Sequence, residues 1–342
     1  MNQLKFSSLV IWTVLISLFL SCKDEHPAPV PEVFQFPSKV IHKIVVDNSG
    51  VKWFSTEKGI VSYNNLVWTS YSDAQNLTTG SVADLAVEIT SGIKKLWLGT
   101  DIGLTSMEFG STAISLLNYR TKNAGILADN VTALGIDGSN VKYIGTSKGL
   151  SILKDSKWDK FFGRKNEEIL SQYKISGVGT ATNGYIYAAT QGGGVTRFKY
   201  TDAVSGATTY KRPWAWGLPS DTVYTVFVDG NEQWYGTFRG AGYHSTEFTK
   251  SDWITYTRTE GLICDSVYAI AKDLSGNMWF GTPKGVSKLS ISPTDTTWTN
   301  YTTKDGLVAD KVNTIAADID GSVWFGTDKG ISHFKSNIWE KF

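Results

Sequence analysis

The sequence predicts an all-β fold, a seven-bladed β-propeller of four-stranded antiparallel blades. A phrase close to Trp-Phe-Gly-Thr-x-x-Gly recurs seven times, at spacings of 44 to 47 residues. Each period contains four short runs rich in β-branched and aromatic residues, which is typical of a propeller blade. No stretch has the sustained 3.6-residue periodicity of solenoid helices. The copies begin at Trp53, Trp97, Tyr143, Tyr187, Trp234, Trp279 and Trp324.

The seventh copy illustrates the predicted blade. Its first two strands flank Asp320-Gly321, a hairpin turn signal. Aspartates recur in this turn of other copies, where calcium is an alternative explanation, but the alternating acidic ligands of an EF-hand loop are missing. Turn chemistry explains these aspartates without a metal. The four strands are predicted at 312–318, 323–327, 331–334 and 338–342.

The ring is predicted to close without a shared blade. The first and the last copies each hold four strands, so neither needs a strand from the opposite terminus. A blade must bury both faces of its sheet against neighbours. We therefore expect blades one and seven to pack face to face, with Val33 to Phe36 as an additional strand.

Residues 1–22 are predicted to be a signal peptide. Lys5 supplies the positive charge, and 6–20 is an apolar core too short for a confident membrane span. The segment ends in Ser21-Cys22 and resembles a bacterial lipoprotein signal, in which the cysteine becomes the lipidated first residue. The alternative is an ordinary signal peptide with an incidental cysteine. Cys264 is the one other cysteine, so no disulfide framework is expected.

Residues 23–38 are predicted to tether this anchor to a propeller that spans 39–342. Four prolines within the tether favour an extended backbone. Its first residues, Lys23-Asp24-Glu25, resemble the signal that sends Bacteroidetes lipoproteins to the outer face of the outer membrane. A solvated charged linker is the alternative. We expect a cell-surface outer-membrane lipoprotein, and a periplasm-facing one is the alternative.

The repeat itself resembles a known family. The pattern Asp-x-x-Gly-x-x-Trp-Phe-Gly-Thr-x-x-Gly-Leu/Ile, followed by Trp-x-x-Tyr and Gly-Leu, resembles the two-component regulator propeller repeat over nearly all of the chain after the tether. The resemblance implies a ligand-sensing propeller of hybrid two-component systems, many of which respond to glycans. Those sensors continue into a membrane span and kinase parts, whereas this sequence ends at the seventh copy, so we expect binding without phosphorylation.

A candidate ligand site emerges where the repeat is broken. Of the 13 tryptophans, ten occupy recurring second- or fourth-strand positions and Trp12 lies in the signal peptide. The other two, Trp214 and Trp216, lie in the loop that joins blades four and five. Aromatic rings beside an arginine and open glycine backbone predict a stacking surface for a sugar ring or an aromatic ligand. The predicted site comprises Trp214, Trp216, Phe238, Arg239, Tyr243, Gly192, Gly193 and Lys284.

Two alternatives compete with this site. Trp214 is alternatively a displaced fourth-strand tryptophan, because blade four lacks a clean copy of that strand. A basic residue also recurs in one turn of five blades, which predicts attraction of an anionic ligand or is simply a solvated turn residue. These basic residues are Lys58, Lys148, Arg239, Lys284 and Lys329.

The remaining features favour binding over catalysis. A net charge of +1 without a basic stripe argues against nucleic acid as a partner. The histidines are dispersed, and no zinc pattern, nucleophile elbow or P-loop is present. We expect a monomer, without metal or cofactor, that binds a glycan or another small ligand. A scaffold for envelope proteins is the second interpretation, and a lyase-like enzyme with a histidine and a carboxylate inside the ring is the third. The histidines are His26, His42, His244 and His333.

Overall fold

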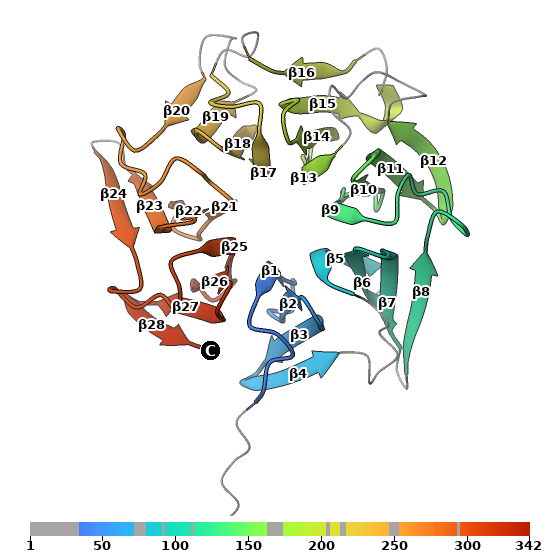
Figure 1. Ribbon diagram of the computed structural model, residues 1–342, viewed down its shortest axis with the longest axis horizontal. Coiled ribbons are helices and arrows are strands. Elements are labelled where there is room, and N and C mark those ends of the chain that lie inside the picture. Colours follow the sequence, from blue (N-terminus) through green and yellow to red (C-terminus); the bar gives the residue numbers. More distant parts are fainter. Residues whose placement is uncertain are drawn as a thin grey trace, which may run out of the picture. The chain divides into compact units, whose positions relative to one another are not determined.

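The predicted seven-bladed propeller is confirmed. The computed structural model describes residues 34–71, 80–90, 93–110, 113–162, 174–202, 206–212, 217–245, 253–292 and 295–342. The chain divides into two compact units, Met1–Gln35 and Phe36–Phe342. The second unit is a ring of seven four-stranded antiparallel sheets (Figure 1).

Each blade is built from consecutive strands, the first at the centre of the ring and the fourth at the rim (Figure 1). Blade one comprises β1 (Ile41–Val46), β2 (Lys52–Thr56), β3 (Gly59–Asn64) and β4 (Val67–Tyr71). Blade two comprises β5 (Val82–Thr90), β6 (Ile93–Thr100), β7 (Gly103–Phe109) and β8 (Ile114–Tyr119). Blade three comprises β9 (Val131–Ile136), β10 (Lys142–Thr146), β11 (Gly149–Lys154) and β12 (Lys157–Phe162).

The other four blades follow the same order. Blade four comprises β13 (Ile175–Thr180), β14 (Tyr185–Thr190), β15 (Val195–Lys199), the 3-10 turn η2 (Tyr200–Asp202) and β16 (Thr208–Tyr210). Blade five comprises β17 (Val223–Asp229), β18 (Glu232–Thr237), β19 (Gly240–Ser245) and β20 (Ile254–Tyr256). Blade six comprises β21 (Ala269–Lys272), β22 (Met278–Thr282), β23 (Gly285–Ile291) and β24 (Thr296–Tyr301). Blade seven comprises β25 (Val312–Ala317), β26 (Val323–Thr327), β27 (Ile331–Lys335) and β28 (Ile338–Lys341).

Carboxylates of the first turn hold the second-strand tryptophans. Trp53 Nε1 donates to Asp47 Oδ2 over 3.0 Å, and Trp279 Nε1 donates to Asp273 Oδ2 over 2.8 Å. The Asp47 carboxylate also accepts the backbone N–H of Val51 at 3.1 Å. These aspartates therefore satisfy the buried indole and the N–H groups of the turn, which explains their recurrence.

At three blade boundaries, a lysine of the following blade forms an ion pair with the carboxylate that accepts the indole N–H of a second-strand tryptophan. Each ammonium also lies 5.4 to 5.9 Å from the centre of the indole that the carboxylate holds. We call these groups the lysine staples, because each joins two blades through a charge-assisted contact. The distances from Nζ to the carboxylate oxygen are 2.5 Å for Lys94–Asp47, 2.7 Å for Lys142–Glu88 and 2.6 Å for Lys52–Asp318.

The staples predict loss of stability in acid. Burial raises the pKa of Asp47, but hydrogen bonds from Lys94, Trp53 and the backbone outweigh it and leave that pKa below its ordinary value. The pKa of Glu88 is lowered in the same way. A carboxyl group with a lowered pKa in the folded state stabilises the fold above its unfolded pKa of about 4 and loses that contribution as the pH falls further. We expect the urea midpoint to fall steeply between pH 5 and pH 3, because the unfolded chain takes up protons on these carboxylates more readily than the folded protein does.

A Lys94→Met variant tests the origin of this slope. Without Lys94, the buried Asp47 carboxylate keeps its hydrogen bonds from Trp53 and Val51 but loses its counter-ion, so the variant should be less stable than the parent at pH 7. The difference between the two proteins should shrink as the carboxylate is protonated. A difference that stays constant from pH 7 to pH 3 would show that the staple does not contribute through charge.

The threonine of the phrase fixes the turn between the second and third strands. Thr237 Oγ1 donates to the carbonyl of Gly240 over 2.8 Å and accepts the N–H of Arg239 at 3.1 Å. Gly240 has a φ of +122°, and a Cβ there would lie 2.5 Å from the carbonyl oxygen of Tyr256. Only glycine fits this approach without strain. The turn therefore presents residues 238 and 239 to solvent from a rigid backbone.

Blades one and seven close the ring by packing face to face, as predicted. The backbone N–H of Ile44 donates to Thr314 Oγ1 over 3.2 Å, and Asn313 Nδ2 donates to the carbonyl of Ile41 over 3.1 Å. The rings of Phe54 and Trp324 lie 5.8 Å apart across the same boundary. No strand is exchanged between the two blades.

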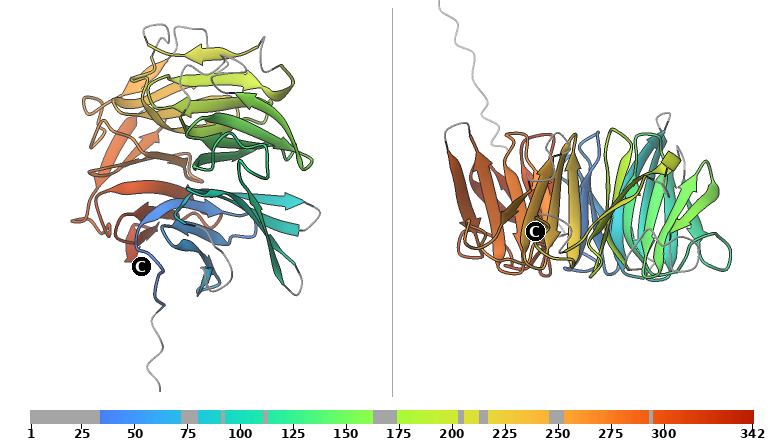
Figure 2. Two further views of the ribbon diagram at one scale, coloured as in Figure 1. Left: turned by 45° about the vertical axis from the view of Figure 1, so that its right-hand side comes forward. Right: turned by 90° about the horizontal axis from the view of Figure 1, so that it is seen from above.

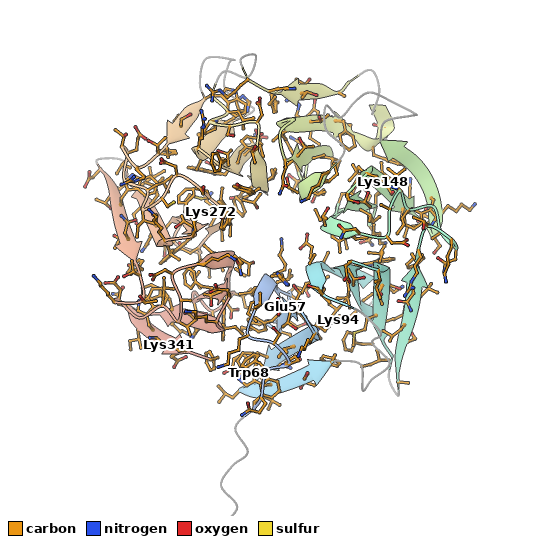
Figure 3. The ribbon with its side chains drawn as sticks, in the orientation of Figure 1. Glu57, Trp68, Lys94, Lys148, Lys272 and Lys341 are labelled. Atoms are coloured by element: carbon orange, nitrogen blue, oxygen red, sulfur yellow. The ribbon has the colours of Figure 1, made fainter. Side chains whose placement is uncertain are left out.

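The additional strand expected at Val33 to Phe36 is wrong for the described residues Phe34–Phe36, which form no strand. Phe36 instead packs edge-on against Trp68, with ring centres 4.8 Å apart. Trp68 lies on the side of blade one that faces blade seven, where its ring is 5.2 Å from Phe342, whereas Lys94 lies on the other side (Figure 3).

Candidate functional site

A pocket of about 490 Å³ lies at the junction of blades four and five. It is on the face of the ring that carries the turns between second and third strands; the strands of every blade run between this face and the opposite one (Figure 2). The pocket is polar and cationic, with one aromatic ring. Its lining residues are Arg212, Ser220, Asp221, Thr222, Phe238 and Arg239.

Phe238 and Arg239 enter the pocket from the tip of the turn between β18 and β19. The N–H of Phe238 donates to the carbonyl of Thr222 over 3.0 Å, which anchors this tip to the loop before β17. The phenyl ring is nevertheless 51% exposed. Both arginines of the pocket, Arg212 and Arg239, are exposed as well. The site thus combines an accessible aromatic ring with two guanidinium groups.

Asp221 organises the opposite wall. Its carboxylate accepts the backbone N–H of Arg212 at 2.6 Å, and its carbonyl accepts the N–H groups of Gly192 and Gly194, each at 2.9 Å. Arg212 Nη1 donates to the carbonyl of Pro219 over 3.3 Å. The same use of an aspartate recurs in later blades, where Arg258 donates its N–H to Asp265 and Thr303 donates its N–H to Asp310. Asp221 is therefore a structural residue that positions Arg212.

The structure brings together only part of the predicted site. Phe238 and Arg239 line the pocket, and the N–H of Gly192 donates a hydrogen bond to the carbonyl of Asp221, which forms part of the pocket wall. Gly193 faces its own turn, where its N–H donates to Thr190 Oγ1 over 3.1 Å. Trp214 and Trp216 lie outside the described residues.

Tyr243 and Lys284 lie apart from the pocket. Tyr243 is three residues along β19, and its hydroxyl is 3.5 Å from Glu232 at the start of β18, toward the opposite face of the ring. Lys284 occupies the equivalent turn of blade six, where its N–H donates to Thr282 Oγ1 over 3.1 Å. The sequence did not reveal four of the residues that line the pocket, which are Arg212, Ser220, Asp221 and Thr222.

One pattern in the sequence could have pointed to Asp221. An aspartate recurs seven to nine residues after the residue whose N–H it accepts, at Asp221, Asp265 and Asp310.

The register of blade four bears on the alternative role of Trp214. Tyr210 pairs with Val195 as Tyr301 pairs with Val286 in blade six, so Tyr210 is the last aromatic residue of its fourth strand. The position three residues earlier, tryptophan in most blades, is therefore Ala207. The fourth-strand position is thus already filled by a small residue, and Trp214 follows the strand in sequence.

The five recurrent basic residues are all exposed at equivalent turn positions. Each donates its backbone N–H to the threonine of its own phrase, at 3.0 or 3.1 Å. The turn geometry therefore accounts for the backbone and leaves the side chains free to differ. Lys148 is marked on blade three in Figure 3.

The central channel contains a histidine and a carboxylate, which the lyase interpretation requires. A cavity of about 180 Å³ is lined by residues of the innermost strands, among them His42, Lys43 and Asp84. Asp84 binds the Lys43 ammonium at 3.4 Å and accepts the N–H of Leu134 from the next blade at 2.8 Å. His42 Nε2 is 3.2 Å from Ser81 Oγ, and burial lowers the pKa of His42. Asp84 thus bridges blades, and each of the two groups is engaged by other partners.

Among the described residues, no group of three or more histidine, cysteine, aspartate or glutamate side chains is arranged to hold a metal ion. No helix in the described part of the chain has the length and apolar character needed to cross a membrane. Cys264 is half-buried and free.

Comparison with known proteins identifies the repeat. Residues 306–329 match the model of the two component regulator propeller. This stretch runs from the turn before blade seven through the whole of β25 and β26, and it confirms the resemblance predicted from the phrase. No curated protein matches the chain.

Solved structures with the same fold include extracellular domains of putative two component systems and a lyase. The extracellular domain of the putative hybrid two component system BT3049 from B. thetaiotaomicron has a TM-score of 0.73 and 20% identity, over 88% of this chain and 40% of that one. The extracellular domain of BT4673 from the same organism has a TM-score of 0.69 and 18% identity, over 87% of this chain and 38% of that one. Virginiamycin B lyase from Staphylococcus aureus has a TM-score of 0.64 and 12% identity, over 86% and 93% of the two chains. The chain spans about 40% of the length of the first two, and these similarities establish the fold.

Proposed function

We propose that this propeller of two component regulator repeats is a surface-tethered binding protein that holds an acidic oligosaccharide between blades four and five. The observation that carries the proposal is Phe238, a half-exposed ring at the edge of a pocket that contains two arginines. The extracellular location of these similar domains is consistent with a ligand from outside the cell.

The turn position of Phe238 supports a role in binding. Exposed aromatic surface is unfavourable in water, and the turn does not require an aromatic side chain there. The other six copies have residues at this position that are mostly polar, and in five of them the turn has the same hydrogen bond from the threonine to the glycine carbonyl three residues on. The equivalent residues are Glu57, Asp101, Ser147, Gln191, Pro283 and Asp328.

The chemistry of the pocket matches a sugar acid. The C–H face of a pyranose ring can pack on the ring of Phe238. The sugar hydroxyls can exchange hydrogen bonds with the hydroxyl groups of Ser220 and Thr222. A guanidinium binds carboxylate or sulfate with two parallel hydrogen bonds. The Arg239 guanidinium has no hydrogen bond or ion pair with any described residue, so it is available for such an anion.

Removal of the guanidinium should weaken binding without affecting the fold. We expect Arg239→Gln to weaken capture of uronic-acid or sulfated oligosaccharides on a glycan array by at least about tenfold, the loss of a charged hydrogen-bonded contact. Phe238→Ser should have a similar effect on affinity. Neither side chain is buried, so both variants should keep the melting temperature of the parent.

Lys329→Gln provides the matched control, since Lys329 has the same turn position in blade seven. It should retain parental affinity, and binding by the parent should fall as salt is raised because the contact is ionic. Equal losses in the Arg239 and Lys329 variants would contradict a local pocket and indicate a diffuse basic face. Undiminished binding by both pocket variants would rule out the site.

We also propose that Cys22 carries the lipid that tethers the propeller to the outer membrane. The support is the apolar segment followed by Ser21-Cys22 and a Pro-rich spacer. In cells, Cys22→Ala should abolish incorporation of a clickable palmitate analogue and move the protein from the membrane to the soluble fraction. Accessibility to added protease in intact cells distinguishes the surface from the periplasm. Unchanged labelling of the variant would eliminate the anchor.

A further inference from the structure

The tip of the turn between β18 and β19 separates two pockets. On one side, the N–H of Phe238 donates to the carbonyl of Thr222 over 3.0 Å, in the pocket between blades four and five, which we call the Phe238 pocket. On the other side, the N–H of Gly240 donates to the carbonyl of Asp265 over 2.6 Å. Asp265 lines a pocket of about 620 Å³ in the loop that joins blades five and six, which we call the Arg258 pocket. A chain-like ligand that leaves the first pocket therefore reaches the second by crossing this tip.

An arginine at the start of the loop distinguishes these two junctions from others in the ring. At four junctions among the described residues, an aspartate accepts the backbone N–H of a residue in the loop between blades. The pairs are Thr121–Asp129, Arg212–Asp221, Arg258–Asp265 and Thr303–Asp310. The contact uses only the backbone of the donor, so the loop does not require an arginine there. The guanidinium groups are thus an addition to the repeat on the two sides of one tip.

The Arg258 pocket presents unused donors and an unused acceptor. Arg258 is exposed, and its guanidinium has no hydrogen bond or ion pair with any described residue. Asn300 Nδ2 donates to the carbonyl of Gly261 over 3.2 Å, which leaves the second hydrogen of that amide for a ligand. Asp265 Oδ1 accepts the N–H of Arg258 at 2.7 Å, whereas its Oδ2 has no hydrogen bond with the described part of the chain.

The charge of the lining differs between the two pockets. Two guanidinium groups and one carboxylate line the Phe238 pocket, whereas one of each lines the Arg258 pocket. The Glu260 carboxylate adds negative charge beside the Arg258 pocket, where it accepts the N–H and the hydroxyl of Thr257 at 2.6 and 2.7 Å. An anion therefore meets an excess of positive charge only in the Phe238 pocket. Sugar hydroxyls, which both donate and accept, match the mixed groups of the Arg258 pocket.

We propose that the Arg258 pocket is a second subsite, which takes an uncharged sugar unit of the oligosaccharide whose acidic unit lies beside Phe238. This inference rests on the proposed function and adds the composition of the ligand, a mixed polymer of acidic and uncharged sugars. Arg258 and Asn300 donate to hydroxyl or amide oxygens of the uncharged unit, and Asp265 accepts from its hydroxyl groups.

The test compares two probes by titration calorimetry with the purified protein. Methyl glucuronide supplies the acidic unit alone, and a hyaluronan tetrasaccharide alternates glucuronate with uncharged N-acetylglucosamine. We expect the tetrasaccharide to bind at least about tenfold more tightly, because it fills both pockets. Arg258→Gln should weaken tetrasaccharide binding at least about fivefold and leave methyl glucuronide within about twofold of the parent. Lys304→Gln is the matched control, since it removes the same charge from an exposed loop residue at the next junction, and it should change neither affinity by more than about twofold.

A second variant tests the preference for an uncharged unit. Asp265→Asn keeps an oxygen that accepts the N–H of Arg258 but removes the negative charge. It should raise the affinity for tetragalacturonate, in which every unit is acidic, relative to the hyaluronan tetrasaccharide by at least about threefold. An unchanged ratio between the two tetramers would overturn the assignment of an uncharged unit.

The outcomes separate this inference from the proposed function. Tetrasaccharide binding that is lost in Arg239→Gln but unchanged in Arg258→Gln would overturn the second subsite and leave the Phe238 pocket in place. Binding that neither variant weakens, or absence of binding to the parent, would overturn both.

Discussion

Replacement of Trp324 by alanine should lower the free energy of unfolding by about 3 to 5 kcal/mol, as expected for deletion of a fully buried aromatic side chain. Trp324 is 2% exposed. Its Nε1 donates to Asp318 over 3.2 Å, and its ring lies 5.4 Å from Tyr63 and 5.8 Å from Phe54. The substitution therefore leaves a cavity between blades seven and one and removes a hydrogen bond from a buried carboxylate.

Urea denaturation followed by circular dichroism measures this loss. Trp324→Phe keeps an aromatic ring but removes the N–H donor, so its smaller loss, about 1 to 3 kcal/mol, isolates the contact with Asp318. Ile338→Ala in the same blade is the control, because Ile338 is 65% exposed and should contribute less than about 0.5 kcal/mol. A loss below that of the control would mean that the closing boundary does not limit stability.

Replacement of Gly326 by valine should destabilise the same boundary by about 3 kcal/mol through overpacking. A Cβ at Gly326 would lie 2.6 Å from Ile41 Cγ2 and 2.5 Å from Thr314 Cγ2. Ile41 is completely buried, so it has no free space into which to move. The glycine of the phrase is thus dictated by the first strand of its own blade together with the first strand of the following blade.

A double-mutant cycle identifies Ile41 as the clashing partner. The combined loss in Ile41→Ala/Gly326→Val should be smaller than the sum of the single losses by about 1 kcal/mol or more. Ala189 has the same register position in blade four and already carries a Cβ, so Ala189→Gly should change the free energy of unfolding by no more than about 1 kcal/mol. Strictly additive losses would place the strain elsewhere.

The sequence period was sufficient to predict the fold because each blade is contiguous in the chain. The phrase starting at Trp53 or Trp279 predicted a second strand and its turn, and both lie where expected. The lysine staples could not be predicted in this way. Lys142 lies 54 residues from Glu88, and Lys52 lies 266 residues from Asp318, so only the ring brings these charges together.

The candidate site was predictable only where it depends on turn chemistry. The Thr-x-x-Gly turn placed Phe238 and Arg239 on one face, and they do line one pocket. Tyr243 follows only four residues after Arg239, but an extended strand rises about 3.4 Å per residue and carried its hydroxyl toward the opposite face. Arg212 was missed because its position depends on a backbone contact with Asp221, which composition does not reveal.

The boundary between blades seven and one differs from the other six in one respect, since no peptide link crosses it. Every blade consists of consecutive strands, and the closing contacts are made by side chains and by bonds from Ile44 and Asn313. The ring can consequently be cut in a loop between any two blades and its original ends joined, with no strand left orphaned. Circular permutants of this chain should therefore fold to the same ring. In the native chain, the boundary between blades seven and one is the one at which two blades can separate without straining a covalent connection between them.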